Sequence, residues 1–186
     1  MAEALIRPQS LQEFLDWERR QPERYEYLDC AARMRTGGSL DHATIAGNLL
    51  AELRDKLRGT RCRPFNDDAK VVGDGQAIYP DVSVTCSEID SGENDVMPDP
   101  VVIVEVVSPS SERVDCGQKK FRCFATPSVQ HYAVVEQDAI RVDLYTRVGD
   151  VWTNTILEGP DAVMRLTAIG VEIRLAALYE GTSLAA

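Results

Sequence analysis

The residues best suited to chemistry are carboxylates and a lysine that fall on neighbouring predicted elements. Glu105 interrupts a run of β-branched residues at 101–107. Such a run is typical of a strand buried on both faces, where an ionised carboxylate must be paired, hydrogen-bonded or bound to a cation. This position favours a functional role for Glu105. The alternative is a glutamate at the water-facing edge of an otherwise buried strand.

Asp81 lies at the start of another predicted strand, 79–86, directly after Pro80. If this strand neighbours 101–107, Asp81 and Glu105 converge near one end of the sheet, within reach of Lys119 or Lys120 on the next helix. Two carboxylates about 4 Å apart repel each other, and a divalent cation relieves that repulsion. Oxygen ligands suit Mg²⁺, which can activate a bound water, and a nearby ammonium can orient that water or neutralise developing charge.

Each of these residues also has a structural interpretation. Asp81 could cap the turn that precedes its strand, and Asp115 is interpreted as a helix N-cap. Lys119 could lie on a solvated helix face, and Glu26, between two tyrosines, could be a solvent-facing strand carboxylate. His42 lies in the first turn of a predicted helix, where a single histidine is more often a surface or capping residue than a ligand.

The elements that must position these groups follow from apolar periodicity. A capping box at Ser10 and Glu13 starts a helix over about 10–21, and an apolar stripe predicts the strongest helix at 40–58, with Asp41 as its candidate N-cap. A third helix is expected after 115–118, ending before Pro127. Strands are expected at 25–36 (a hairpin or bent strand), 61–65, 70–72, 79–86, 101–107, 129–136, 140–147, 151–157 and 171–175.

This order of elements predicts an α/β fold with a mixed central sheet flanked by helices. The length of 186 residues fits one domain, 1–186, because no linker or internal repeat divides the chain. Acidic residues at 87–99 predict a loop, and a polar turn is expected at 108–114. No apolar run approaches the roughly 18 residues that span a bilayer, so no membrane partner is expected.

Charge and cysteine content narrow the class of protein. The formal net charge of −10 counts against a passive nucleic-acid-binding module, but it is compatible with an enzyme that gathers carboxylates around a metal and binds DNA through a local basic patch. The five cysteines stand at 30, 62, 86, 116 and 123, without a Cys-x-x-Cys pair. That scatter argues against a disulfide framework or a zinc knuckle, and it predicts a reducing, cytoplasmic location, as does the lack of a secretory signal at 1–7.

Several motifs together resemble the Uma-two family of restriction-endonuclease-like proteins, a branch of the PD-(D/E)XK nuclease superfamily. They are Pro80-Asp81, the segment Glu-Val-Val-Ser-Pro-Ser-Ser at 105–111, Asp115 and Lys119. Shorter matches are Tyr-Glu-Tyr-Leu-Asp at 25–29, His42 with Ile45, and Val-Gln-His-Tyr at 129–132. The likeness extends from about residue 11 to residue 179, and the Glu-x-x-Ser-Pro-Ser element is its most specific part.

The resemblance implies a restriction-endonuclease-like fold and a metal-dependent phosphodiesterase. By it, Asp81 and Glu105 are metal ligands for Mg²⁺, with Mn²⁺ as an alternative, and Glu26 is a further acidic catalytic residue. The superfamily lysine usually stands two positions after the glutamate, where this chain has Val107. The matching lysine of this family is Lys119. Cys30, Cys123 and Ala133 differ from the usual family residues and are interpreted as packing changes.

The function expected from these observations is Mg²⁺-dependent hydrolysis of DNA phosphodiester bonds. Because two DNA strands require two sites, a homodimer is expected, with the antiparallel hairpin at 140–157 as a candidate interface. Two alternatives stay open: a catalytically inactive binding or assembly protein on the same fold, which the charge and Val107 favour, and a hydrolase of smaller phosphoesters. Metal binding distinguishes the first alternative, and activity on nucleotides but not on duplex DNA distinguishes the second.

Overall fold

The computed structural model describes residues 8–35, 37–89, 95–107 and 115–185, with the backbone alone at 115–118. The polar turn expected at 108–114, including the Ser-Pro-Ser motif, lies outside the described residues, as does the middle of the acidic loop at 87–99. Asp115 is the first residue of a helix, but its interpretation as an N-cap concerns a side chain outside the description.

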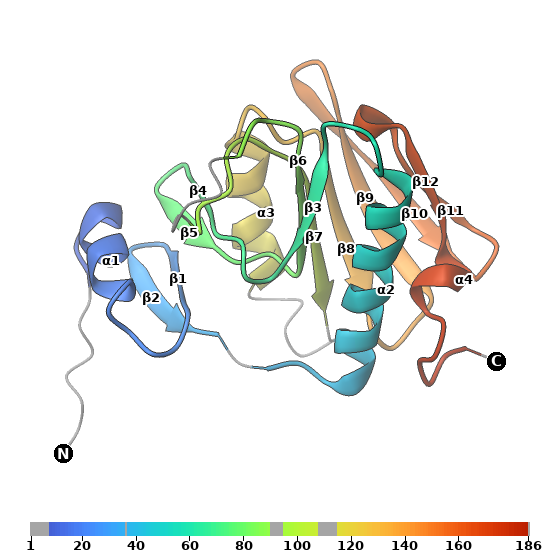
Figure 1. Ribbon diagram of the computed structural model, residues 1–186, viewed down its shortest axis with the longest axis horizontal. Helices are drawn as coiled ribbons and strands as arrows, with labels where there is room; N and C mark the ends of the chain where they lie inside the picture. The colour runs from blue at the N-terminus through green and yellow to red at the C-terminus, as the bar shows by residue number, and fades with distance from the viewer. Residues whose placement is uncertain (1–7, 36, 90–94, 108–114, 186) are drawn as a thin grey trace.

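A six-stranded mixed sheet forms the centre of the molecule (Figure 1). Its order is β10 (Val151–Glu158), β9 (Arg141–Val148), β8 (His131–Glu136), β7 (Pro100–Val107), β6 (Val82–Thr85) and β3 (Arg63–Asn66). β7 and β8 are parallel and are joined through helix α3 (Asp115–Ala125), whereas every other neighbouring pair is antiparallel. This arrangement is the mixed α/β fold that the order of elements predicts.

The residues of β7 alternate between two cores, as the period of two in a strand requires. Val102 and Val104 pack with helix α2 (Leu40–Lys56), with the hairpin of β11 (Val163–Leu166) and β12 (Val171–Arg174), and with the short helix α4 (Leu175–Leu178). Ile103 and Val107 face the opposite side, where Cys123 of α3 is buried. Glu105 lies two positions from both Ile103 and Val107, so its side chain points to the same face of the sheet, the one covered by α3.

A smaller sheet carries the N-terminal part of the chain beside this core (Figure 1). Its order is β2 (Ala31–Met34), β1 (Tyr25–Leu28), β5 (Gln76–Ile78) and β4 (Val71–Gly73), and helix α1 (Leu11–Glu18) packs against it through Phe14 and Tyr27. Asp29 and Cys30 join β1 to β2 with φ values of 50° and 59°. Cys30 therefore occupies a left-handed position that glycine adopts without strain, so its difference from the family is a matter of backbone conformation and not of packing.

Local capping explains where α1 and α2 begin. Ser10 caps α1 by accepting a hydrogen bond from the N–H of Glu13, as the capping box predicts. Ser39, and not Asp41, caps α2, because its hydroxyl accepts from the N–H of His42. Asp41 instead accepts hydrogen bonds from the N–H and hydroxyl of Ser183. The expectation of Asp41 as the N-cap is therefore wrong.

Strands β5 and β11 and the 3-10 turn at Thr167–Ile169 are absent from the sequence-based expectations, because each is too short for a clear apolar period. The scatter of the cysteines argued against a disulfide framework, but one pair is bonded. Cys62 and Cys86 form a disulfide, with their Cα atoms 3.9 Å apart, at the point where β3 meets β6. Cys30 and Cys123 are free thiols. Within the described residues, every helix is too short or too polar to cross a membrane.

Candidate active site

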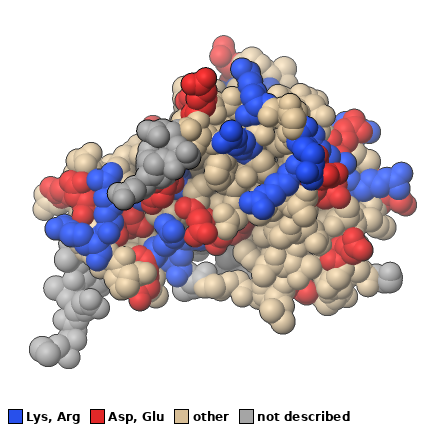
Figure 2. All heavy atoms as spheres, in the orientation of Figure 1, with Lys and Arg blue, Asp and Glu red and all other residues tan. Residues whose placement is uncertain are grey.

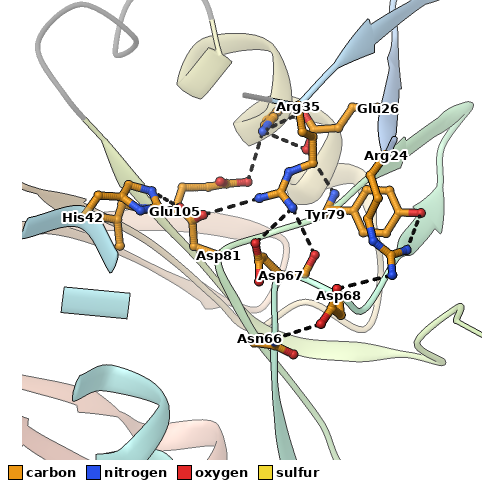
Figure 3. Close-up of polar contacts among 12 residues, drawn as sticks. Arg24, Glu26, Arg35, His42, Asn66, Asp67, Asp68, Tyr79, Asp81 and Glu105 are labelled. Atoms are coloured by element: carbon orange, nitrogen blue, oxygen red, sulfur yellow. Dashed lines mark hydrogen bonds and ion pairs between the residues drawn. The ribbon is translucent and has the colours of Figure 1, made fainter. Parts of the chain in front are cut away.

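A cleft of about 960 Å³ separates the β1–β2 hairpin and the segment after it from the N-terminal half of α2. Its lining includes all four residues predicted to form the site: Glu26, Asp81, Glu105 and Lys119. They come from β1, the residue before β6, β7 and α3, respectively. Figure 3 shows three of them, together with Arg35 and His42, pointing toward one another.

The register of β6 and β7 places Asp81 beside Glu105. Val82 is paired with Val104 in this antiparallel ladder, so the next step along it brings Asp81 opposite Glu105 on the same face. Oδ2 of Asp81 accepts a hydrogen bond of 2.7 Å from the N–H of Val106. Asp81 therefore joins two strands of the sheet and does not cap the turn at Pro80.

Glu105 is buried with unused bonding capacity. Its residue is 6% exposed, and its Oε1 atom has no hydrogen-bond partner among the residues that the structure describes. Burial raises the pKa of Glu105 to about 8; the Lys119 ammonium opposes this shift, and the Asp81 and Glu26 carboxylates add to it. A buried oxygen without a donor is a costly group unless a cation or a proton binds it. The position at a water-facing strand edge is therefore excluded for Glu105.

Glu26 and Lys119 form a buried ion pair. The Nζ atom of Lys119 lies 2.9 Å from Oε2 and 3.1 Å from Oε1 of Glu26, and it lies 3.6 Å from Oε1 of Glu105. Oε1 of Glu26 also accepts a hydrogen bond of 3.0 Å from the N–H of Tyr79. Because both charged residues are less than 10% exposed, the interpretations of Glu26 as a solvent-facing carboxylate and of Lys119 as part of a solvated helix face are wrong.

His42 and Arg35 are cleft residues that the sequence analysis did not assign to the site. Nε2 of His42 lies 3.2 Å from Oδ2 of Asp81, and this hydrogen bond raises the pKa of the imidazole. Interpreting His42 as a surface or capping residue is therefore wrong. A signal was present, because His42 stands three positions before the buried Ile45 and so shares the inward face of α2.

Arg35 follows β2 and lines the cleft. Its Nη1 atom donates to the carbonyl oxygen and to Oδ2 of Asp67, at 3.1 Å and 3.2 Å, and its Nη2 atom lies 3.7 Å from Oδ1 of Asp81. The guanidinium group thus places a permanent positive charge next to the carboxylates. No pattern in the sequence distinguishes this arginine, because its position depends on how the hairpin packs.

A second cluster of buried charges holds the hairpin in place. Lys70 is 1% exposed, and its Nζ atom lies 2.8 Å from Oε2 of Glu18 and 2.9 Å from Oδ2 of Asp95. The hydroxyl of Tyr79 donates to Oε1 of Glu18 at 2.7 Å, while the N–H of the same tyrosine donates to Glu26. Tyr79 therefore connects helix α1 to the acidic residue of the cleft.

The donor set of the cleft fits a hard divalent cation in its chemistry. Asp81 and Glu105 offer carboxylate oxygens, and Oε1 of Glu105 is buried without a hydrogen bond from any described residue. Mg²⁺ needs only one or two carboxylates, because water and phosphate oxygens complete its coordination. In the part of the chain that the structure describes, no three His, Cys, Asp or Glu side chains already surround one point as ligands. The ammonium of Lys119 lies between Glu26 and Glu105 instead.

Known proteins include relatives that match almost the whole chain. This protein is 35% identical to the uncharacterized protein slr1290 of Synechocystis, over 92% of each chain. It is 30% identical to the uncharacterized protein sll1609 of the same organism, over 81% of this chain and 88% of that one. Among solved structures, a "putative nuclease belonging to DUF820" from Anabaena variabilis has the same fold, with a TM-score of 0.76, 18% identity, and coverage of 91% of this chain and 97% of that one.

The family comparison agrees with the motifs. The profile of the Uma2 family, described as "Putative restriction endonuclease", matches residues 11–177. That range contains all four predicted site residues and every element that lines the cleft. The fold, the motifs and the extent of the match lead to one conclusion: this chain belongs to the Uma2 family of restriction-endonuclease-like proteins.

Proposed function

We propose that the protein is an endonuclease that hydrolyses DNA phosphodiester bonds with Mg²⁺, or with Mn²⁺ in its place. The observation that carries this proposal is the meeting of Asp81 and Glu105 from adjacent strands, with Lys119 3.6 Å from Glu105, in one cleft. Membership in a restriction-endonuclease-like family supports the reaction class. The size of the cleft, about 960 Å³, leaves room for a nucleotide and its flanking phosphates.

Each residue of the cleft has a role in this proposal. Asp81 and Glu105 hold the metal, which when bound lowers the pKa of a water and offsets charge on the phosphate. Lys119 orients the attacking water or neutralises the developing negative charge, taking the part that Val107 cannot. Glu26 holds the Lys119 ammonium at 2.9 Å and is a further acidic residue for the site.

Arg35 and His42 extend the same arrangement. His42 holds the Asp81 carboxylate from one side, and the N–H of Val106 holds it from the other. When a cation neutralises Asp81, the guanidinium of Arg35 loses an ion-pair partner 3.7 Å away. We assign Arg35 to a non-bridging phosphate oxygen of the substrate, because a guanidinium binds phosphate with two parallel donors.

The experiment that tests this function compares cleavage by matched variants. Supercoiled plasmid, linear duplex and single-stranded DNA are incubated with Mg²⁺ or Mn²⁺ and the wild type, Asp81→Asn, Glu105→Gln or Lys119→Met. We expect cleavage by the wild type and a loss of at least a hundredfold in each variant. Glu172→Gln, on β12 and ion-paired with Arg165, is the control and should retain full activity. Equal cleavage by wild type and Asp81→Asn would show a contaminant and refute the assignment.

Cutting both strands of a DNA duplex requires two active sites, so we also propose that the protein is a homodimer. We place it in the cytoplasm, where its DNA substrate lies. Support for the interface comes from the β9–β10 hairpin, in which Val148, Val151 and Ile156 are each more than 50% exposed and β10 is an edge strand. Sedimentation of the wild type and of Val151→Lys tests this point: a dimer that dissociates in the variant is expected. In a reducing cytoplasm the Cys62–Cys86 pair would be a dithiol.

A further inference from the structure

Five basic side chains gather where α2 ends and β3 begins. Residues 52–63 carry five basic and two acidic side chains, a formal charge of +3 in a chain whose total is −10. All five basic residues are exposed, and Lys and Arg side chains gather over this end of α2 in the space-filling view (Figure 2). We call them the basic surface: Arg54, Lys56, Arg58, Arg61 and Arg63.

The helix dipole explains only part of this charge. Cations near a helix C-terminus are favourable, which accounts for Arg54, Lys56 and Arg58. Arg61 and Arg63 lie beyond the last turn of the helix, so the helix dipole does not account for them. Two of the five cations form exposed ion pairs within the helix segment, Lys56 with Glu52 at 3.4 Å and Arg58 with Asp55 at 3.5 Å. Such exposed pairs are weak and open readily for a stronger anion.

The other three cations have no ion pair within the described part of the chain, and they stand on a fixed backbone. Arg61 and Arg63 flank Cys62, whose Cα atom lies 3.9 Å from that of Cys86, the residue after β6. Arg63 also begins β3 and is paired in register with Thr85. The buried Leu53 and Leu57 anchor the last turn of α2 below Arg54. A preorganised backbone lowers the entropy lost when these side chains bind a ligand.

Both elements that carry the basic surface reach the candidate active site. Leu50 of α2 lines the cleft, and the helix then runs on past Arg54 to Lys56. Asn66, at the other end of β3 from Arg63, lines the same cleft. With a helix rise of 1.5 Å per residue, the path from Leu50 to Lys56 is about 9 Å. Phosphates follow one another by about 3.4 Å per strand along duplex DNA, so the surface reaches phosphates about three nucleotides from the cleft.

We propose that the basic surface binds the sugar-phosphate backbone of duplex DNA and holds the flank of a molecule whose reacting phosphate lies in the cleft. This inference rests on the proposed function and adds to it a second site, distant from the reacting atoms. Exposed arginine and lysine side chains meet the charged phosphates at the surface of the duplex and not the base edges within a groove. The surface therefore adds affinity with little preference for sequence, and it keeps an acidic protein on an acidic polymer.

The test is a salt titration of DNA binding with the full-length protein. A labelled 30-base-pair duplex is titrated in EDTA, so that no metal-dependent cleavage occurs, at 50–200 mM KCl. One variant removes three charges of the basic surface: Arg54→Gln, Arg61→Gln and Arg63→Gln. The matched control removes three exposed arginines from the turn after α1 and from the β11–β12 hairpin: Arg20→Gln, Arg165→Gln and Arg174→Gln.

We expect at least tenfold weaker binding by the basic-surface variant at 100 mM KCl and a salt slope that is smaller by about 2 to 3, since each phosphate contact contributes about 0.9. The control should bind within twofold of the wild type. A third variant, with lysine at the same three positions as the glutamine variant, should keep the wild-type slope, because a phosphate contact needs only positive charge. This variant also gives a result if the glutamine substitutions impair folding, which circular dichroism reports.

The outcomes separate this inference from the proposed function. Unchanged affinity and slope in the basic-surface variant overturn the surface while leaving cleavage in the cleft intact. An equal loss in the control variant overturns it as well, because total charge alone would then explain binding. Loss of binding in the basic-surface variant, with no cleavage by the wild type under any metal condition, supports the surface and refutes the nuclease.

Discussion

The ammonium of Lys119 lies 3.6 Å from a carboxylate oxygen of Glu105 that accepts no hydrogen bond within the described part of the chain. The same ammonium is held at 2.9 Å by Glu26. A lysine from α3 thus supplies positive charge between two buried carboxylates of β1 and β7. A divalent metal that binds Glu105 must compete with this charge or displace it, and the first prediction follows from that competition.

Replacement of Lys119 by methionine should destabilise the metal-free protein and tighten metal binding. Two buried carboxylates would lose their cation, and breaking a buried pair costs about 3 to 5 kcal/mol. Urea unfolding measures the first effect, and calorimetric titration with Mn²⁺ measures the second. Lys120→Met is the control, because Lys120 contacts Tyr145 on the other side of α3. Weaker Mn²⁺ binding by Lys119→Met would contradict competition between the ammonium and the metal.

The stability of the metal-free protein should fall as pH rises from about 4.5 to about 8. Burial raises the pKa of Glu105 from 4.5 to about 8, so the folded state binds more protons than the unfolded state within this window. The contribution is complete below the unfolded value and is lost as pH passes the folded one. Urea unfolding between pH 5 and 9 checks this, with Glu105→Gln as reference. Parallel profiles for the two proteins would refute the shift.

The pKa values of the two histidines should be shifted in opposite directions, upward for His42 and downward for His131. Nε2 of His131 accepts a hydrogen bond from the N–H of Ala168, which requires the neutral ring, and burial lowers its pKa to about 4. The hydrogen bond to Asp81 raises the pKa of His42 above 6.5. Proton NMR of the imidazole rings measures both values, with His42→Gln to assign them. A His131 midpoint near 6.5 would contradict the structure.

The same histidine gives a stability prediction at acid pH. Because the folded pKa of His131 is below the unfolded value of 6.5, its contribution is complete above pH 6.5 and is lost as pH falls toward 4. Across this pH range, the contribution of His131 to the free energy of unfolding changes by about 3 kcal/mol. His131→Gln should remove this part of the acid dependence when unfolding is measured from pH 4 to 7, whereas His42→Gln should retain it.

Alanine at Gly38 should displace the ring of His42 from Asp81. A Cβ atom at Gly38 would lie 2.6 Å from Cγ of His42, whereas a Cβ at Gly37 meets no atom within 4 Å. Gly38→Ala should therefore return the His42 pKa toward 6.5, and Gly37→Ala should leave it raised. The NMR titration of His42 in both variants measures this. Identical titrations in the two variants would show that the ring tolerates the added methyl group.

Lys70→Met should destabilise the protein without acting on metal binding directly. The substitution leaves Glu18 buried without its ammonium, at a cost of about 3 to 5 kcal/mol. Lys56→Met, at an exposed position, is the control and should change stability by less than about 0.5 kcal/mol. Urea unfolding gives both values. If only Lys70→Met lowers the free energy of unfolding, the buried ion pair with Glu18 is what holds α1 against the rest of the protein.

The local patterns of the sequence were enough to identify several elements and part of the candidate site. The capping box at Ser10 and Glu13 set the start of α1, because capping depends on residues three positions apart. The β-branched run at 101–107 identified β7, and the carboxylate within it drew attention to Glu105. Residue positions also pointed to Asp81 and to Lys119 or Lys120, and the family motifs then added Glu26 and selected Lys119. All of this information lies within short windows of the chain.

Only the tertiary structure decided which of these groups meet. The register of β6 and β7 sets Asp81 beside Glu105, and the packing of α3 brings in Lys119. The ring of His42 faces Asp81 for the same reason. The Cys62–Cys86 bond likewise joins residues that are distant in sequence. Such contacts depend on strand order, register and packing between distant segments, and no local pattern of residue types encodes these quantities.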